Sequence, residues 1–191
     1  MSNLERGFKS WAEHLAADIR KDLQLGPQAP FSPKALADYL DVQLLTPRDI
    51  HGMTDELLDQ LLGDDPWSWS AVTLVTNQST RVIFNPKHSV GRRASTLMHE
   101  LAHLLLDHKP SKVIVSYDGS IVMRTFDAKQ EEEAGWLAGC LLLPRIVLLR
   151  VVKQGHPVEQ IASEYGVTEK LANYRIRICG VDAQVRALTR R

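Results

Sequence analysis

The chain has 191 residues, which is enough for one well-packed domain. Its composition, with 44% hydrophobic and 24% charged residues, excludes collagen-like, coiled-coil and wholly disordered proteins. Basic and acidic residues balance at 23 each, so no global positive charge draws the protein to nucleic acid. Two cysteines are too few for a disulfide framework, and the N-terminus lacks the apolar run of a signal peptide. We therefore expect a cytoplasmic protein.

The first part of the chain is predicted to be helical, followed by a short β region. Apolar residues recur at helical spacing over 8–24, before Gly26-Pro27. Ser32 before Pro33 predicts a helix through Leu40, and Thr54 caps another helix. The period then changes, and 71–76 and 80–84 are β-rich runs around a polar turn. They predict a hairpin or two adjacent strands.

Helices dominate the rest of the sequence. One helix is predicted over 90–107, and 112–116 and 120–125 are predicted strands around Tyr117-Asp118-Gly119, a tight-hairpin signal. Further helices are predicted over 128–143, 145–154 and 157–188, the last with one break at Gly166. These elements predict an α+β protein, a single helix-rich domain with a small sheet.

The segment His99-Glu100-Leu101-Ala102-His103 carries the strongest chemical signal. Histidines four residues apart lie on one helix face, so both imidazoles can reach one metal ion. Glu100 follows the first histidine, where it can hydrogen-bond a water at the metal. The alternative is two unrelated histidines on a core helix, which would leave three buried polar groups in need of partners. The pattern therefore favours a zinc site, which needs a third protein ligand besides the two histidines.

The third ligand is expected from a different part of the chain. The metzincin continuation would need Gly at position 106 and His at position 109, where this chain has Leu106 and Lys109. His108 is expected to point away from the ligand face, as a solvated histidine at the helix end. A second apolar helix begins with the acidic run 131–133. Acids are common at helix N-termini, but beside this motif one of them is the better candidate for a ligand.

The HELAH motif at 99–103 and the stretch from Glu131 to Pro144 together resemble the ImmA/IrrE family of zinc metallopeptidases. The family's usual downstream pattern is E-x-E-A-N-x-F-A-A-x-L-L-M-P. The similarity extends to Arg92-Arg93, to 82–85 and to 161–176, and covers about residues 30–180. It implies a zincin-like (gluzincin-type) active-site helix. Residues 31–191 would then form the metallopeptidase domain, and residues 1–30 an N-terminal helical extension.

The resemblance also implies a role for each site residue. His99 and His103 are zinc ligands, Glu100 is the catalytic general base, and Glu131 is the third ligand with Glu133 in reserve. Gly135 departs from the family pattern, which has Asn or Asp there, a side chain that could orient a ligand. The implied activity is narrow-specificity peptide hydrolysis. The implied substrate is a helix-turn-helix (XRE-like) transcriptional repressor, whose cleavage switches on a stress, mobile-element or phage-defence response.

Two other functions stay open at the level of sequence. Residues 161–177 match a helix-turn-helix, with Gly166 in the turn and Thr168 as a cap. Residues 173–191 hold five arginines against one aspartate, so a DNA-binding regulator is the second hypothesis, with nucleic-acid contact through the C-terminal arginines. A net-neutral chain lacks the wider basic face that phosphate contacts need. A metal-bound sensor or partner that does not cleave is the third, resting on Gly135.

Some residues are candidates for supporting roles by type alone. Cys140 lies near the predicted site and is a candidate regulatory thiol. Peptide hydrolysis also needs a donor for the oxyanion, for which the candidates are Tyr174, His88 and the pair Arg92-Arg93.

Overall fold

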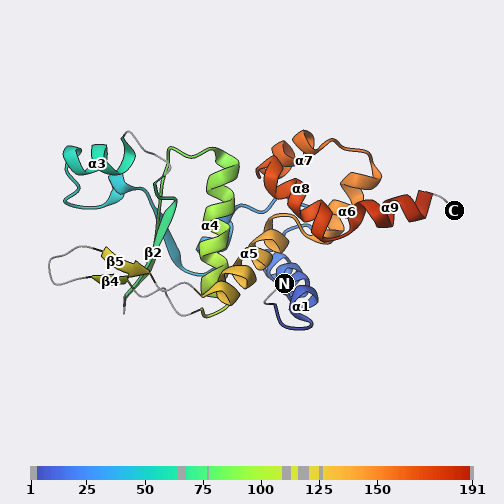
Figure 1. The fold of residues 1–191 in the computed structure, drawn as a ribbon, viewed down its shortest axis with the longest axis horizontal. Helices are drawn as coiled ribbons and strands as arrows, with labels where there is room; N and C mark the ends of the chain where they lie inside the picture. The colour runs from blue at the N-terminus through green and yellow to red at the C-terminus, as the bar shows by residue number, and fades with distance from the viewer. Residues whose placement is uncertain are drawn as a thin grey trace.

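The helix α4 (Val90–Leu105) stands between a small sheet on one side and the C-terminal helices on the other (Figure 1). The computed structural model describes residues 4–63, 68–76, 78–108, 113–115, 121–124 and 127–189. The predicted turn at 117–119 lies outside these ranges. Helices far outnumber strands, so the predicted α+β class, one helix-rich domain with a small sheet, is confirmed.

The main sheet has the strand order β1-β3-β2. The predicted hairpin is confirmed, since β2 (Ala71–Val75) pairs antiparallel with β3 (Thr80–Phe84). The strand β1 (Val42–Leu45), parallel to β3, was not predicted, because four residues are too few to show a period. The central strand places Val82 fully inside the core, and β2 lies at the edge of the sheet.

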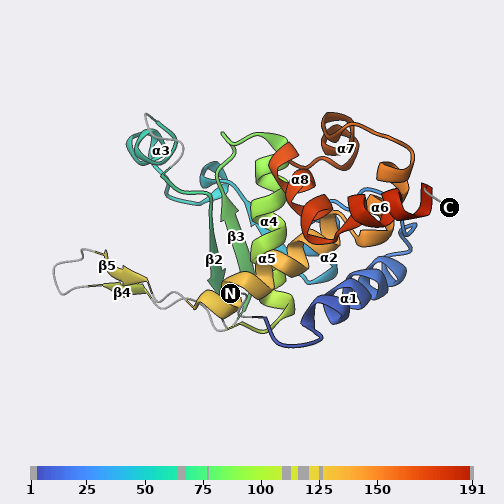
Figure 2. The same ribbon diagram turned by 45° about the vertical axis from the view of Figure 1, so that its right-hand side comes forward.

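Short helices and a second ribbon surround this sheet. Ser32 and Thr54 cap α2 (Pro33–Tyr39) and α3 (Asp55–Leu62) through their side chains, as predicted. A 3₁₀ turn, η1 (Pro47–Asp49), follows β1. The strands β4 (Val113–Val115) and β5 (Ile121–Arg124) pair antiparallel and project from the body of the molecule (Figure 2).

The remaining helices fill the other side of α4. They are α1 (Phe8–Asp22), α5 (Ala128–Leu142), α6 (Arg145–Lys153), α7 (Val158–Tyr165), α8 (Glu169–Ile178) and α9 (Val181–Thr189). Gly166 has a left-handed backbone (φ 61°) and ends α7 as predicted. The prediction of a single break in this region is wrong, because Gly180 (φ 63°) separates α8 from α9 within an otherwise continuous apolar pattern.

The core is centred on the contact between α4 and α5, and α1 packs against α5 as well. Ala12 and Ala16 of α1 are fully buried, so this helix shares the core of the domain. A boundary at residue 30 stays a prediction. Within the described ranges no single helix is long and apolar enough to span a membrane. Taken together across a 52° bend, α5 and α6 reach that length and composition, although most of α5 is buried in the core.

A buried arginine ties three of the helices together. Arg175 of α8 is 1% exposed, and its guanidinium donates twice to the carbonyl oxygen of Leu143. Its Nη2 also donates to Glu13 Oε1 of α1 at 2.6 Å, while Glu13 Oε2 accepts from the backbone N–H of Arg145 at the start of α6. Arg175 is one of the five C-terminal arginines that suggested nucleic-acid binding, and in the fold it is a core residue.

We expect the Glu13→Gln variant to lose about 2 kcal/mol of unfolding free energy, because Arg175 would keep a buried charge without its counter-ion. Urea denaturation measures this loss. The control is Glu5→Gln, which removes the surface partner of Lys129 and should leave stability unchanged. Equal stability of both variants and the wild type would show that the buried pair contributes nothing to the fold.

Candidate metal centre

Two imidazoles meet on the face of α4 that is turned toward α5. Ser89 caps the helix by accepting from the N–H of Arg92. Its apolar face is buried by a run of side chains at helical spacing, Ala94, Leu97, Met98, Leu101 and Ala102. His99 and His103, one turn apart, are left at the edge of this face, with their Nε2 atoms 3.0 Å apart. A single ion can therefore be reached by both.

The first turn of α5 brings a carboxylate to these imidazoles. Asp127 caps α5 through its side chain, so Glu131 lies where the helix begins. Glu131 Oε2 is 3.1 Å from His99 Nε2, and Oε1 is 3.5 Å from His103 Nε2. Ligand atoms at about 2.0–2.2 Å from zinc in a tetrahedron stand about 3.4 Å apart. The three side chains thus fit one face of a tetrahedral site with its fourth position free for water, although their ligand role stays a prediction.

The electrostatic surroundings keep His103 in the form that binds metal. Burial, and secondarily the neighbouring His99, lowers the pKa of the His103 imidazole to about 4. An imidazole with this pKa is neutral at physiological pH and offers a lone pair to a cation.

Glu100 is held by a residue that the sequence did not single out. Its Oε2 accepts a hydrogen bond from Thr73 Oγ1 at 2.5 Å. Thr73 lies in the edge strand β2, opposite the buried Val82 of β3. The alternation of β2 would have turned its apolar residues Val72 and Leu74 inward, but both are exposed, and Thr73 is the residue that faces α4. The contact with Glu100 joins two elements that are far apart in the chain, so no local pattern indicates it.

His108 lies against the site, so the expectation of a solvated histidine pointing away is wrong. Its side chain is 8% exposed, and its Nδ1 is 2.9 Å from His103 Nδ1. The expectation applied helical geometry to His108 from a predicted helix over 90–107, whereas α4 ends at Leu105. Asp107 takes a left-handed backbone (φ 50°), its N–H bonds to Leu104 O, and the N–H of His108 bonds to His103 O. This Schellman turn folds His108 back over the preceding turn.

Neighbouring positions on α5 have different partners. Glu133, the alternative ligand, lies outside the three-ligand cluster of His99, His103 and Glu131. Its Oε2 is 3.2 Å from His108 Nε2. Gly135 lies beside the first imidazole, since a Cβ atom there would be 3.9 Å from His99 Nδ1. A side chain at this position would therefore face His99, one of the predicted ligands.

The supporting candidates have mostly structural surroundings. Cys140 is fully buried and burial raises the pKa of its thiol, which argues against a reactive regulatory thiol. His88 is 4% exposed, and Arg93 donates to Pro86 O in the loop before α4. Arg92 donates to Ser70 Oγ. Tyr174 is 41% exposed, on the outer face of α8.

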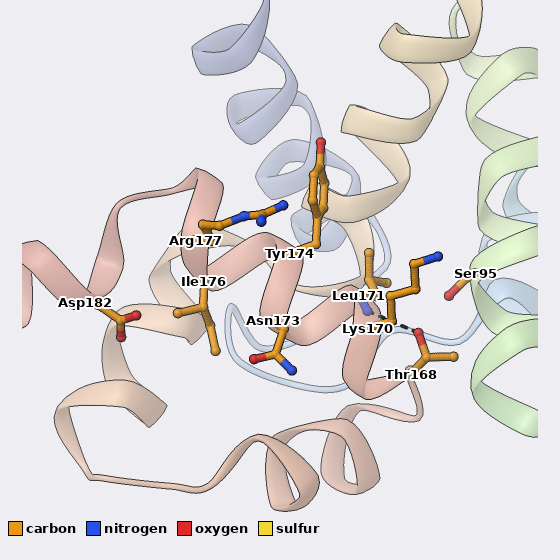
Figure 3. A pocket seen from close by; sticks show the side chains of 9 residues that line it. All are labelled: Ser95, Thr168, Lys170, Leu171, Asn173, Tyr174, Ile176, Arg177 and Asp182. Carbon is orange, nitrogen blue, oxygen red and sulfur yellow. Dashed lines mark hydrogen bonds between the residues drawn. The ribbon is translucent and has the colours of Figure 1, made fainter.

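A groove of about 840 Å³ runs along that face of α8 (Figure 3). Its walls carry polar side chains, among them Lys170, Asn173, Tyr174 and Arg177. Ser95 of α4 lines the other side, one helical turn before His99 and on the same face of the helix. The groove therefore reaches α4 one helical turn from His99, and none of the residues that line it belongs to the candidate metal centre.

The comparison with family models assigns the chain to a protein family. The model of the M78 peptidases, described as the IrrE N-terminal-like domain, matches residues 66–177. The chain belongs to this family. The resemblance seen in the sequence is thereby confirmed, and the match spans α4, α5 and almost all of α8. No curated protein matches the chain.

A solved structure shares the fold of this M78 family member. It is a Mycobacterium tuberculosis transcriptional regulator, 14% identical, with a TM-score of 0.54. The alignment covers 87% of this chain and 46% of that one, so the chain spans about half the length of the regulator. At this identity the similarity is one of fold alone.

The ligand set can be tested by metal content. We expect the purified wild type to hold about one zinc per chain, and Glu131→Ala to lose it, because a three-ligand site becomes a two-ligand site. Glu133→Ala is the matched control, since it removes a carboxylate two residues away, and it should retain more metal. Elemental analysis after dialysis measures both, and the reverse order would assign the ligand role to Glu133.

Gly135 offers a gain-of-function test. We expect Gly135→Asn to place an amide oxygen beside His99 Nδ1–H and to tighten zinc binding by about tenfold, the lower end of such effects. Gly135→Ala fills the same space without an acceptor and should bind zinc like the wild type. Competition with a chromophoric chelator gives both affinities. Equal affinities for the two variants would exclude an orienting role at this position.

Proposed function

We propose that this M78 family member is a zinc-dependent endopeptidase of narrow specificity. The observation that carries the proposal is the meeting of His99, His103 and Glu131 from two helices, with Glu100 beside them in an HExxH helix. Two imidazoles and one carboxylate are the ligand set of many zinc peptidases, and this set leaves one position open. A cytoplasmic location, as expected from the sequence, belongs to the same proposal.

Glu100 and Thr73 would have separate roles in peptide hydrolysis. When bound, zinc supplies a Lewis acid that acidifies a water and polarises a carbonyl group. Glu100 would take the proton of the attacking water on its carboxylate and deliver it to the leaving amine. Thr73 donates to Oε2 of Glu100, which holds the carboxylate in place and leaves Oε1 for the water. This division assigns Glu100 the role of general base.

Two surfaces next to the site suit an extended peptide. In the described part of the chain β2 pairs only with β3, so its other edge presents backbone groups beside Glu100. An extended segment can add to such an edge through main-chain hydrogen bonds. The groove along α8 would take side chains of the same segment, and Lys170, Asn173 and Arg177 supply donors there.

The proposed substrate is a helix-turn-helix (XRE-like) transcriptional repressor, cleaved to start a stress, mobile-element or phage-defence response. Support comes from the resemblance to the ImmA/IrrE family. The solved structure with a similar fold is titled a transcriptional regulator, which agrees with a role in regulation.

A second function, DNA binding through α8, has one observation in its favour. Gly166 and Thr168 join α7 and α8 as a helix-turn-helix would, and α8 exposes Lys170, Asn173 and Arg177. The turn is, however, packed on α4, since a Cβ atom on Gly91 would lie 2.6–2.8 Å from the backbone of Val167 and Thr168. With Arg175 buried as well, we favour a packing role for this pair.

The proposal is tested by Glu100→Gln. We expect this variant to bind zinc like the wild type and to cleave at least about a hundredfold more slowly, because the base is lost while the ligands remain. The substrate is a purified XRE-like repressor from the same organism, and fragments are read by mass spectrometry. Zinc binding without cleavage by either protein would favour the non-cleaving sensor, and duplex DNA bound equally by both would favour the regulator.

A further inference from the structure

The three-ligand cluster has a second layer that the proposed function does not use. His103 Nδ1 lies 2.9 Å from His108 Nδ1, and His108 Nε2 lies 3.2 Å from Glu133 Oε2. We propose that His108 and Glu133 form a positioning relay that fixes His103 in the tautomer presenting a bare Nε2 to the metal. This inference rests on the proposed function and adds two positioning residues to it.

The direction of each hydrogen bond in the relay follows from Glu133, the carboxylate at its end. An ionised carboxylate only accepts, so the nitrogen of His108 that faces Glu133 carries the hydrogen. In the proposed relay His108 is neutral, so it has one N–H and its Nδ1 is an acceptor. His103 must then donate from its own Nδ1, which leaves the lone pair on Nε2. That atom is the one turned toward His99 and Glu131.

Because His108 and Glu133 are buried, these hydrogen bonds determine the tautomer of His103. The side chains of His108 and Glu133 are 8% and 14% exposed, so water competes little for their polar atoms. Lys129, one turn before Glu133 on α5, has its Nζ 3.8 Å from Glu133 Oε1, so the carboxylate has a cation beside it as well as His108. A metal-ligating histidine commonly donates its other N–H to a fixed acceptor, which sets its tautomer and ring orientation. Here the acceptor is His108, whose own tautomer is fixed by the carboxylate of Glu133.

The two ligand histidines are supported differently. His103 has the relay, whereas Gly135 offers His99 Nδ1 no side chain. The relay also gives Glu133 a role that keeps it off the metal, since its Oε2 is occupied by His108. Two acids of the run 131–133 thus have different roles. Glu131 faces the position of the ion, and Glu133 bonds His108, which supports His103.

The decisive measurement needs no variant. Long-range ¹H–¹⁵N correlation spectra of the metal-free full-length protein report which nitrogen of each histidine carries the hydrogen. We expect His103 to be protonated at Nδ1 and His108 at Nε2. Protonation of His103 at Nε2 would overturn the proposal. Because this experiment uses metal-free protein, it decides the relay even if the wild type proves to bind no zinc, which would defeat the proposed function alone.

A matched pair of variants tests the effect on metal binding. His108→Asn places an amide oxygen near the former Nδ1 and keeps an acceptor, whereas His108→Leu has the same shape as Asn and none. We expect His108→Leu to weaken zinc binding by about 10–100-fold and His108→Asn to stay within about threefold of the wild type. Equal affinities for the two variants, whether both retained or both lost, would contradict the relay. Should His108→Leu fail to fold, the tautomer measurement on the wild type still decides.

Discussion

The contact between α4 and α5 is the constraint on which the rest of the structure depends. The helix α4 has one apolar face, which it buries against α5 and its neighbours, whereas α5 is buried on all sides from Trp136 to Leu142. His99 and His103 lie at the rim of the apolar face of α4, and Glu131 lies in the first turn of α5. Once the apolar faces are buried, the three polar ends are forced together, within 4.8 Å of one another. The desolvation of these polar groups opposes this arrangement, and a bound cation would offset it.

The helices around this pair are held by polar groups that the core surrounds. Arg175 joins α8 to α1 through Glu13 and to the end of α5 through Leu143 O. Arg20 of α1 similarly donates to Leu141 O in α5. Buried charges of this kind allow few alternative packings, because any shift leaves a charge without its partners. They connect α1 and the helix-turn-helix-like pair to the helices that carry the candidate metal centre.

The site is asymmetric in how it is supported. Thr73 from the sheet holds Glu100, and His108 and Glu133 hold His103, but Gly135 offers no side chain to His99 Nδ1. Rigid ligands favour tight metal binding, and a less constrained ligand lowers affinity. An M78 peptidase built this way would depend mainly on the His103 side of its cluster for metal retention. The edge strand contacts Glu100 through Thr73, and the α8 groove is lined by Ser95, one turn before His99, so a substrate could contact sheet and helices together.

The sequence alone was sufficient for much of what depends on local periodicity and spacing. The helix that carries HExxH, the Ser32 and Thr54 caps and the β2–β3 hairpin follow from neighbours within a few residues, and the choice of Glu131 as third ligand is a prediction from a family pattern. Tertiary structure decided what depends on distant or irregular backbone. The left-handed backbone at Asp107 returned His108 to the site, where helical spacing pointed it away. The contact of Thr73 with Glu100 and the burial of Arg175 join segments 27 and more residues apart. Such pairings are set by how whole elements pack, and no local pattern in the chain encodes them.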